Sequence, residues 1–343
     1  PLLAADANKV AIIGWGSGMT AGAVLSHDVE KVDAFEIEPA VVEASRFFNS
    51  INGNPLEDSR LHLILGDARS LLLRNEETYD LIISEPSNPW ITGVANLFTK
   101  DFFELAASRL RPDGILSQWF HLYGMSEEST RSLLATFGSV FPHTLVFKDR
   151  DLILLGSRKP IRFDIPRMEA LFSRPRIKES LSGTMVHYPF DLLADLRLDE
   201  RGLAAYSRDA RLNTDDNLLL ELAAPKSLYR DQIESIRAGM ARHSSDVIDH
   251  VTGYRSPADA YIELASSYFT SERKDEALET CRTALEIETT FEGLKLLGII
   301  LENLGRGDEA RVALVEALAL GGDPKGRRFV EALIRSIDSP VSP

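Results

Sequence analysis

The chain has 343 residues, 44% of them apolar and 26% charged, so we expect a soluble globular protein with two or three domains. Its 38 basic and 52 acidic residues give a net charge of −14 without a long basic run, which disfavours a nucleic-acid partner and suits a cationic substrate. The single cysteine, Cys281, excludes an internal disulfide and a cysteine-based zinc cluster, and it fits a reducing compartment such as the cytoplasm.

The first expected element is a strand close to the N-terminus, in NKVAIIG, which suggests that the chain was cut from a longer protein. No apolar run reaches the ~20 residues of a membrane span, and no signal-peptide pattern precedes the strand. We therefore expect the chain as given to be cytoplasmic.

Strands and helices alternate over the first 157 residues. The expected strands are Lys9–Gly14, Val32–Glu38, Leu61–Asp67, Tyr79–Glu85, Gly114–Tyr123, His143–Asp149 and Asp151–Ser157. Most are continuous apolar runs, as in a parallel sheet covered on both faces, and helical patterns separate the first six. Only a short charged region separates the last two, which should form an antiparallel hairpin. The pattern predicts an α/β fold of the Rossmann-like, class I methyltransferase type, a doubly wound sheet with an antiparallel terminal hairpin.

The rest of the chain is expected to be helical. After a Rossmann-like domain at 1–160, residues 161–250 are irregular and proline-containing, and we interpret them as a helical extension and connector. Residues 251–343 contain two copies of a helix-pair pattern offset by 33 residues, with small residues where paired helices pack. This predicts an all-α tetratricopeptide-type domain, with Gly326–Ile337 as a capping helix.

The first strand runs into a glycine-rich stretch, GWGSGMTAG, which spans Gly14–Gly22. Gly14, Gly16 and Gly18 permit a tight strand-to-helix turn and a close approach of the backbone to a ligand. No lysine follows the glycines at the spacing of a P-loop, so a P-loop is excluded.

Acidic residues end the next two strands. Glu36 lies 22 residues after Gly14, where a carboxylate commonly accepts hydrogen bonds from ribose hydroxyls, whereas Glu38 is placed to cap the next helix. Asp67 follows the third strand, either to bind an adenine amino group or to cap a helix, and the sequence favours neither. Together with the glycine turn, these acids predict a nucleoside ligand at the carboxyl edge of the sheet.

The fourth strand ends in LIISEPSNPWITGVANLF, which places Glu85 on the same edge. A carboxylate beside a sulfonium-bearing nucleoside would stabilise a cation, position an amine or accept its proton. Two prolines stiffen the segment that follows and Gly93 offers a hinge, so a substrate-covering lid is one interpretation. The alternative is a structural loop with Trp90 and Phe98 anchored in the core.

The motifs VAIIGWGSGMTAG, FEIEP, LGDARSLL and YDLIISEPSNPWITG resemble the spermidine synthase (polyamine aminopropyltransferase) family over about residues 9–157. The similarity is greatest to bacterial spermidine synthase-like proteins with membrane segments before this domain and tetratricopeptide repeats after it, so the chain is also expected as the soluble part of a membrane-anchored protein. The resemblance implies that five residues hold decarboxylated S-adenosylmethionine: Gly14, Gly16, Gly18, Glu36 and Asp67.

The chain departs from the family in four respects. Glu85 replaces the aspartate that helps to deprotonate the attacking amine, and Asn88 replaces the aspartate that holds the substrate. Ser17 replaces an aspartate that binds the aminopropyl ammonium and repels an α-carboxylate, so intact S-adenosylmethionine should fit at least as well as the decarboxylated form. The usual N-terminal β-hairpin, which contributes to subunit contacts and to the amine site, is absent.

Further polar residues lie near the predicted site. Gln118 and Tyr123 lie at the end of the expected fifth strand and are interpreted either as lining the amine pocket or as capping the sheet, and His121 is a weak candidate beside them. Asp215 and Asp216 either add negative charge near a cationic substrate or simply form a turn and helix cap, the more economical interpretation. The seven histidines show no metal-ligand spacing, so no metal is expected.

Three functional hypotheses follow. The leading one is a spermidine synthase-like transferase of polyamine biosynthesis, in which an amine oriented by Glu85 attacks a carbon next to the sulfonium and methylthioadenosine leaves. The second is a methyltransferase on the same fold, with cleavage or cyclisation of S-adenosylmethionine as a variant. The third is a non-catalytic nucleoside-binding scaffold that binds a protein through its repeats. Self-association into a homo-oligomer is compatible with all three.

Overall fold

The computed structural model describes residues 1–4, 7–148, 151–227 and 232–338, so Asp149, the expected end of the sixth strand, lies outside the described residues. The chain divides into two compact units. The first comprises Pro1–Arg162, Ser173–Ser180 and Asp195–Asp246, and the second comprises Phe163–Phe172, Leu181–Ala194 and Val247–Pro343. The three domain limits expected from the sequence stay a prediction.

The first unit contains an eight-stranded sheet in the order β3-β2-β1-β4-β5-β7-β6-β9. Its strands are β1 (Lys9–Ile13), β2 (Lys31–Glu36), β3 (Leu61–Leu65), β4 (Tyr79–Ser84), β5 (Leu110–Phe120), β6 (His143–Lys148), β7 (Leu152–Ser157) and β9 (Leu196–Asp199). The strands β1 to β5 pair in parallel, while β7 pairs antiparallel with both β5 and β6. The predicted doubly wound sheet and its terminal hairpin are therefore confirmed.

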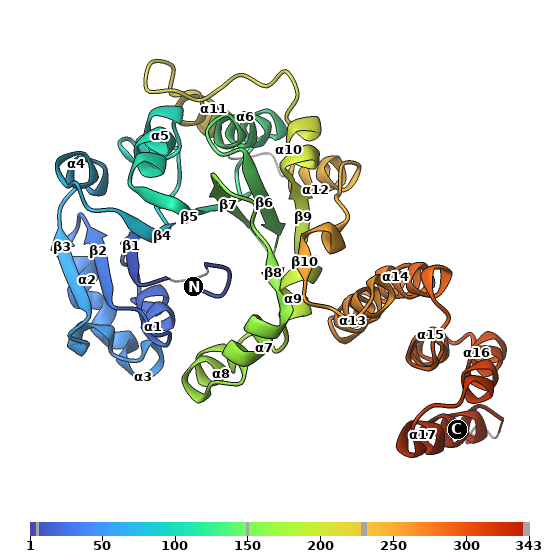
Figure 1. Cartoon of the computed structure of the whole chain (residues 1–343). Coiled ribbons are helices and arrows are strands. Elements are labelled where there is room, and N and C mark those ends of the chain that lie inside the picture. The colour runs from blue at the N-terminus through green and yellow to red at the C-terminus, as the bar shows by residue number, and fades with distance from the viewer. Residues whose placement is uncertain (5–6, 149–150, 228–231, 339–343) are drawn as a thin grey trace. The chain divides into compact units, whose positions relative to one another are not determined.

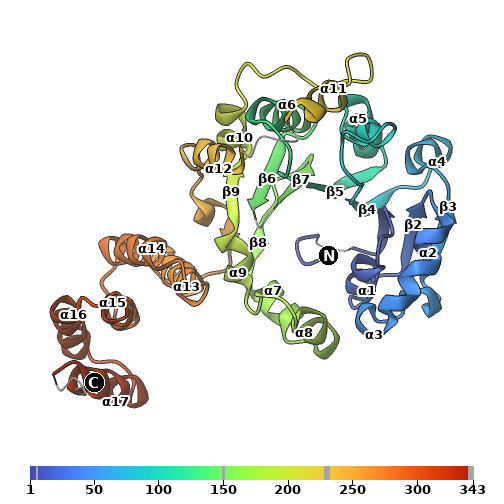
Figure 2. The same ribbon diagram turned by 180° about the vertical axis from the view of Figure 1, so that it is seen from behind.

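Helices cover both faces of this sheet (Figure 1). One group contains α1 (Met19–Leu25), α2 (Pro39–Ser45), η1 (Arg46–Phe48), α3 (Asn49–Asn52) and η2 (Pro55–Glu57), and the other contains α4 (Ala68–Arg74), α5 (Lys100–Ser108) and α6 (Glu127–Gly138). Within the groups α1 contacts α3, and α5 contacts both α4 and α6. Figure 2 shows the two groups from behind, with α1 and α3 below the sheet and α4, α5 and α6 above it in this view.

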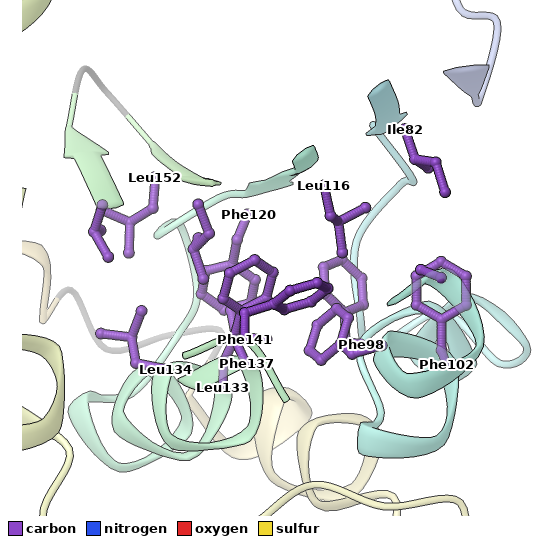
Figure 3. Close-up of a cluster of buried hydrophobic side chains, with 14 of the residues drawn as sticks. Ile82, Phe98, Phe102, Leu116, Phe120, Leu133, Leu134, Phe137, Phe141 and Leu152 are labelled. Atoms are coloured by element: carbon purple, nitrogen blue, oxygen red, sulfur yellow. The ribbon is translucent and has the colours of Figure 1, made fainter. Parts of the chain in front are cut away.

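A large hydrophobic cluster lies between the sheet and the α4–α6 group. Successive side chains of a strand point to opposite faces of the sheet. Ala11 and Ile13, two residues apart on β1, therefore share one face and belong to this cluster. Figure 3 shows Leu116 and Phe120 of β5 beside Phe137 of α6, all fully buried. This packing stabilises the position of β4 and β5 against the helices, because aromatic side chains of this size bury a large apolar area.

The strand β9, which was not expected from the sequence, extends the sheet through an antiparallel pairing with β6, for example Leu198 opposite Val146. This strand has only four residues with two buried leucines, too short a pattern to separate from the helical surroundings. The neighbouring helices α8 (Pro175–Leu181), α10 (Glu200–Tyr206), α11 (Leu219–Ser227) and α12 (Ile233–Ala241) agree with the expected helical extension. Much of that extension therefore belongs to the same compact unit as the sheet.

The second unit is mostly helical. Its elements are β8 (Phe163–Asp164), α7 (Ile165–Phe172), α9 (Pro189–Ala194), η4 (Val247–His250), β10 (Val251–Thr252), α13 (Pro257–Thr270), α14 (Lys274–Ile287), α15 (Phe291–Asn303), α16 (Gly307–Leu320) and α17 (Pro324–Asp338). Consecutive helices from α13 to α17 pack on each other, and a Cβ at Gly298 would lie 2.5 Å from the side chain of Leu314, so any larger residue there would displace that leucine. The helix pairs agree with the pattern in the sequence, while their tetratricopeptide assignment stays a prediction.

None of the helices in the described ranges is both long enough and apolar enough to cross a membrane.

Gly22 tests the packing of α1 on α3. A Cβ at this position would lie 1.9 Å from the carbonyl oxygen of Asn52, so Gly22→Ala should separate the two helices and lower the free energy of unfolding by about 1–3 kcal/mol. Urea unfolding followed by tryptophan fluorescence measures this, because the three tryptophans, at 15, 90 and 119, all lie in the first unit. The matched control is Ser50→Ala, at an exposed position on α3. Equal unfolding midpoints for the two variants would contradict the contact.

Candidate functional site

The carboxyl ends of the first four strands lie side by side. The backbone N–H of Glu85, just after β4, donates to the carbonyl of Ile13 at the end of β1, at 2.9 Å. The N–H of Gly66, after β3, donates to the carbonyl of Glu36 at the end of β2, at 2.8 Å. The strand order reverses between β1 and β4, and ligands of open α/β sheets bind at such a reversal.

The glycine turn after β1 has the backbone that glycine allows. Gly14, Gly16 and Gly18 have φ values of 90°, 53° and 76°, which side chains rarely adopt. A Cβ at Gly14 would lie 2.6 Å from the carbonyl oxygen of Glu85, whereas nothing lies within 4 Å of a Cβ at Gly16. The first glycine therefore lets β1 and β4 approach each other, and Gly16 leaves an open backbone surface.

The turn is also fixed from two sides. The side-chain amide of Asn52 in α3 donates to the carbonyl of Ser17 at 2.9 Å. The carboxylate of Glu36 accepts from the N–H groups of Trp15 and Glu38, each at 2.9 Å. Glu36 is 8% exposed, and each of its carboxylate oxygens has a second lone pair that these bonds do not use.

The acids at 38 and 67 both cap helices. Glu38 accepts from the N–H of Ala40 at 3.0 Å, which confirms its expected role at the start of α2. Asp67 accepts from the N–H of Ser70 at 2.9 Å through Oδ2, so it caps α4 while its side chain stays exposed. The cap uses one carboxylate oxygen, so it is compatible with the second role considered for Asp67.

The carboxylate of Glu85, just after β4, has both a side-chain hydrogen bond and a shifted pKa. The hydroxyl of Thr20, in the first turn of α1, donates to its Oε2 at 2.7 Å. Solvent reaches Glu85, yet the surrounding protein desolvates the carboxyl and raises its pKa above the usual value, and the bond from Thr20 offsets part of this rise. A carboxylate with a raised pKa is a better proton acceptor at neutral pH.

The segment after Glu85 is anchored at its far end. Phe98 is fully buried, and its carbonyl accepts from the side-chain amide of Asn213 at 2.9 Å. Asn96, in the turn η3 (Val94–Leu97), accepts through its carbonyl from Arg69 of α4 at 3.2 Å. The anchoring of Phe98 agrees with the structural-loop interpretation, so a moving lid would be confined to the part before η3, and that lid stays a prediction.

Asp215 does not supply free negative charge. It forms an ion pair with Arg69 and accepts a hydrogen bond from the hydroxyl of Thr99 at 2.7 Å. The hydrogen bonds from Arg69 lower the pKa of Asp215. Asn217 closes the adjoining turn by accepting from the N–H of Thr214 at 3.1 Å, so the turn interpretation of this segment is confirmed.

The residues expected on the substrate side lie at different depths. Gln118 of β5 is opposite Ser84 of β4 and fully buried, and its amide nitrogen donates to the carbonyl of Trp119 at 2.9 Å. Tyr123 lies beyond the end of β5 and is 65% exposed, with its ring 6.4 Å from that of Trp90. Asn88 is half-buried, and its carbonyl accepts from the N–H of Ile91 at 3.0 Å.

The sequence analysis did not find the role of Thr20, and it ranked His121 low. Thr20 lies two residues after the last glycine of the turn, but only the pairing of β1 with β4 brings it to Glu85. His121 contacts the rings of Trp90 and Trp119, which are far from each other in the sequence. Neither relation has a spacing signal that a single sequence reveals.

Comparisons with known proteins agree with the resemblance seen in the motifs. Residues 1–147 match the family model of the spermine/spermidine synthase domain. Putrescine N-methyltransferase 2 of Nicotiana attenuata is 38% identical over 122 residues, which cover 34% of this chain and 33% of the relative. The polyamine aminopropyltransferase of Korarchaeum cryptofilum is 29% identical over 221 residues, which cover 61% of this chain and 67% of the relative.

The match thus spans about a third of the plant relative and about two thirds of the archaeal one. Among solved structures, spermidine synthase from Thermotoga maritima has a TM-score of 0.43 and 18% identity, and the likeness covers 70% of this chain and 71% of that protein.

The hydrogen bond from Thr20 gives a test of the electrostatics at Glu85. Thr20→Val removes a bond to the ionised carboxylate, so the pKa of Glu85 should rise further, and carboxyl ¹³C NMR titration measures it. Because the folded-state pKa lies above the unfolded one, the stability that Glu85 contributes at low pH is lost as the pH rises through the folded value. In the variant this loss should move to higher pH.

The control for this titration is Thr92→Val, which removes a hydroxyl that donates to Glu221 instead, at 3.3 Å. A pKa of Glu85 that is unchanged or lowered in Thr20→Val would contradict the assigned bond.

Proposed function

We propose that the spermine/spermidine synthase domain formed by residues 1–147 belongs to a transferase that uses S-adenosylmethionine or its decarboxylated form. In the leading form of the proposal it transfers an aminopropyl-type group to a polyamine-like amine and releases methylthioadenosine. The observation that carries the proposal is the carboxylate of Glu85, which has a raised pKa and is hydrogen-bonded to the helix that follows the glycine turn.

The nucleoside side of the proposed site consists of the turn and the two strand-end acids. The open backbone at Gly16 and the side chain of Ser17 would lie against the sulfonium-bearing part of the nucleoside. Glu36 would accept from ribose hydroxyls through its unused lone pairs, and Asp67 would bind the adenine amino group. The bonds from Trp15 and Glu38 orient the Glu36 carboxylate before any ligand binds, which reduces the entropic cost of binding.

The proposed reaction is a nucleophilic displacement. The lone pair of the amine nitrogen forms a bond to the carbon next to the sulfonium, and the carbon–sulfur bond breaks with its electron pair going to sulfur. The sulfur leaves as the neutral thioether of methylthioadenosine, and the proton released by the nitrogen passes to the Glu85 carboxylate. Most of the acceleration is expected from the alignment of nitrogen, carbon and sulfur, with proton removal second.

The amine side of the proposal assigns Asn88, Gln118 and Tyr123 to substrate binding. Asn88 offers an uncharged amide where the related family has a carboxylate, so the amine would be held with less negative charge. Gln118 has a buried amide oxygen that has no hydrogen-bond partner in the described part of the chain, and Tyr123 offers an exposed ring. No metal enters this proposal.

Methyl transfer is the second candidate, with S-adenosylhomocysteine as the product. Ser17 favours it, because a neutral side chain accepts the α-carboxylate of intact S-adenosylmethionine where an aspartate would repel it. The similarity to putrescine N-methyltransferase 2 over 122 residues also supports it. Under both candidates the repeats of the second unit would serve a protein partner, which stays a proposal.

Product identification separates the two candidates. The full chain is incubated with each nucleoside, with and without putrescine, and the products are identified by mass. Methylthioadenosine formed only in the presence of the amine supports alkyl transfer, and S-adenosylhomocysteine supports methyl transfer. Methylthioadenosine formed without amine would indicate cleavage, and the absence of any turnover despite nucleoside binding would overturn the proposal.

Glu85→Gln tests the proton acceptor. The amide keeps the size of the side chain but cannot take a proton, so the turnover rate should fall about 10²- to 10⁴-fold while the nucleoside Kd stays within about twofold. The control is Glu76→Gln, an exposed glutamate before β4 and therefore at the opposite edge of the sheet. Full activity of Glu85→Gln would remove the role given to this residue.

A further inference from the structure

His121, directly after β5, carries a buried imidazole. It is 4% exposed, and neither of its ring nitrogens has a hydrogen-bond partner within the described ranges of the chain. Burial lowers the pKa of the ring, so at neutral pH it is uncharged, with one nitrogen as donor and the other as acceptor. An unsatisfied buried polar group destabilises the fold, and a phenyl ring of similar size would avoid that cost.

Aromatic rings hold this imidazole in place. The ring of Trp119 stacks on it at 5.4 Å with an interplanar angle of 26°, and Trp90 meets it edge-on at 4.8 Å and 78°. Trp90 comes from the segment that follows Glu85, and Tyr123 lies beside it at 6.4 Å. The imidazole is therefore oriented by packing alone, within a group of rings whose faces attract cations.

Two further side chains, on β5 and β4, also carry buried polar atoms without hydrogen-bond partners in the described ranges. The amide oxygen of Gln118, three residues before His121, is buried without a partner, and so is the hydroxyl of Ser84, in the described part of the chain. Gln118 and Ser84 are opposite each other on β5 and β4, next to Glu85. The amide nitrogen of Gln118 is already used in a bond to Trp119, so what this side chain still offers is an acceptor.

We propose that His121 is a binding residue for the amine substrate. An N–H group of the amine donates to the unprotonated ring nitrogen of His121, and the rings of Trp90 and Trp119 flank the positive charge of the amine. This inference rests on the proposed function and names the chemistry of its substrate side. The ligand class is a primary aliphatic amine, because acceptors and aromatic faces select a cation with N–H donors over an anion or a neutral polyol. A primary diamine should therefore bind better than the same diamine fully N-methylated.

The test measures amine binding rather than turnover. Putrescine is titrated by calorimetry into the full chain saturated with methylthioadenosine, for the wild type, His121→Phe and His121→Asn. His121→Phe keeps a packed ring without nitrogens and should weaken putrescine about tenfold or more, with an equal or higher melting temperature. The Kd of methylthioadenosine should stay within about twofold, and His121→Asn, which retains an acceptor, should lose less affinity for putrescine.

His62→Asn is the matched control, because His62 is exposed on β3 and outside the proposed site. An unchanged putrescine Kd in His121→Phe, or a lower melting temperature with both ligands weakened equally, would overturn the inference. If His121→Phe does not fold, His121→Asn decides, since an unchanged putrescine affinity there overturns it and a loss confined to putrescine supports it.

Failure of this inference is distinct from failure of the proposed function. Turnover by the wild type with an unchanged putrescine Kd in the His121 variants would leave the transferase proposal intact. Putrescine binding that depends on His121, without turnover of either nucleoside, would leave the binding inference intact and remove the transferase. A wild-type chain that binds methylthioadenosine but no amine would overturn both.

Discussion

The close approach of the β1 and β4 ends is the constraint on which the rest of the site depends. Gly14 follows β1, and any side chain there would collide with the carbonyl of Glu85. Because Gly14 has no side chain, the glycine turn after β1 and the segment that begins at Glu85 leave the sheet at adjacent points, where the strand order reverses. The bond between Thr20 and Glu85 is a consequence, because it joins two residues that are 65 positions apart in the chain.

Much of the fold and part of the site could be predicted because their signals are local. Most of the seven expected strands are continuous apolar runs, and Glu36, Asp67 and Glu85 could be placed on one edge because each stands at the end of an expected strand. The strand β9 and the contact between Thr20 and Glu85 were not predictable in this way. Their positions depend on the pairing of distant segments, which periodicity within a single sequence does not specify.

The two sides of the site differ in how their polar groups are satisfied. On the side of the glycine turn, Glu36 and Asp67 accept hydrogen bonds from the backbone, which fixes their orientation at the time of folding. On the side of β5, Gln118 and His121 keep polar atoms without partners in the described chain, although packing fixes the imidazole. Buried polar atoms without hydrogen bonds cost free energy, and a ligand that forms hydrogen bonds with these atoms would remove that cost.

The pairing of β9 with β6 has a consequence for how the first compact unit can be separated from the rest of the protein. A fragment that ends after β7 would lose β9 and leave one side of β6 as an open edge. It would also lose Asn213 and Asp215, which hold the far end of the loop after Glu85. Exposed edges of this kind recruit other strands, so such a fragment would tend to self-associate, whereas a chain that extends to residue 246 keeps β9 and the rest of the first compact unit.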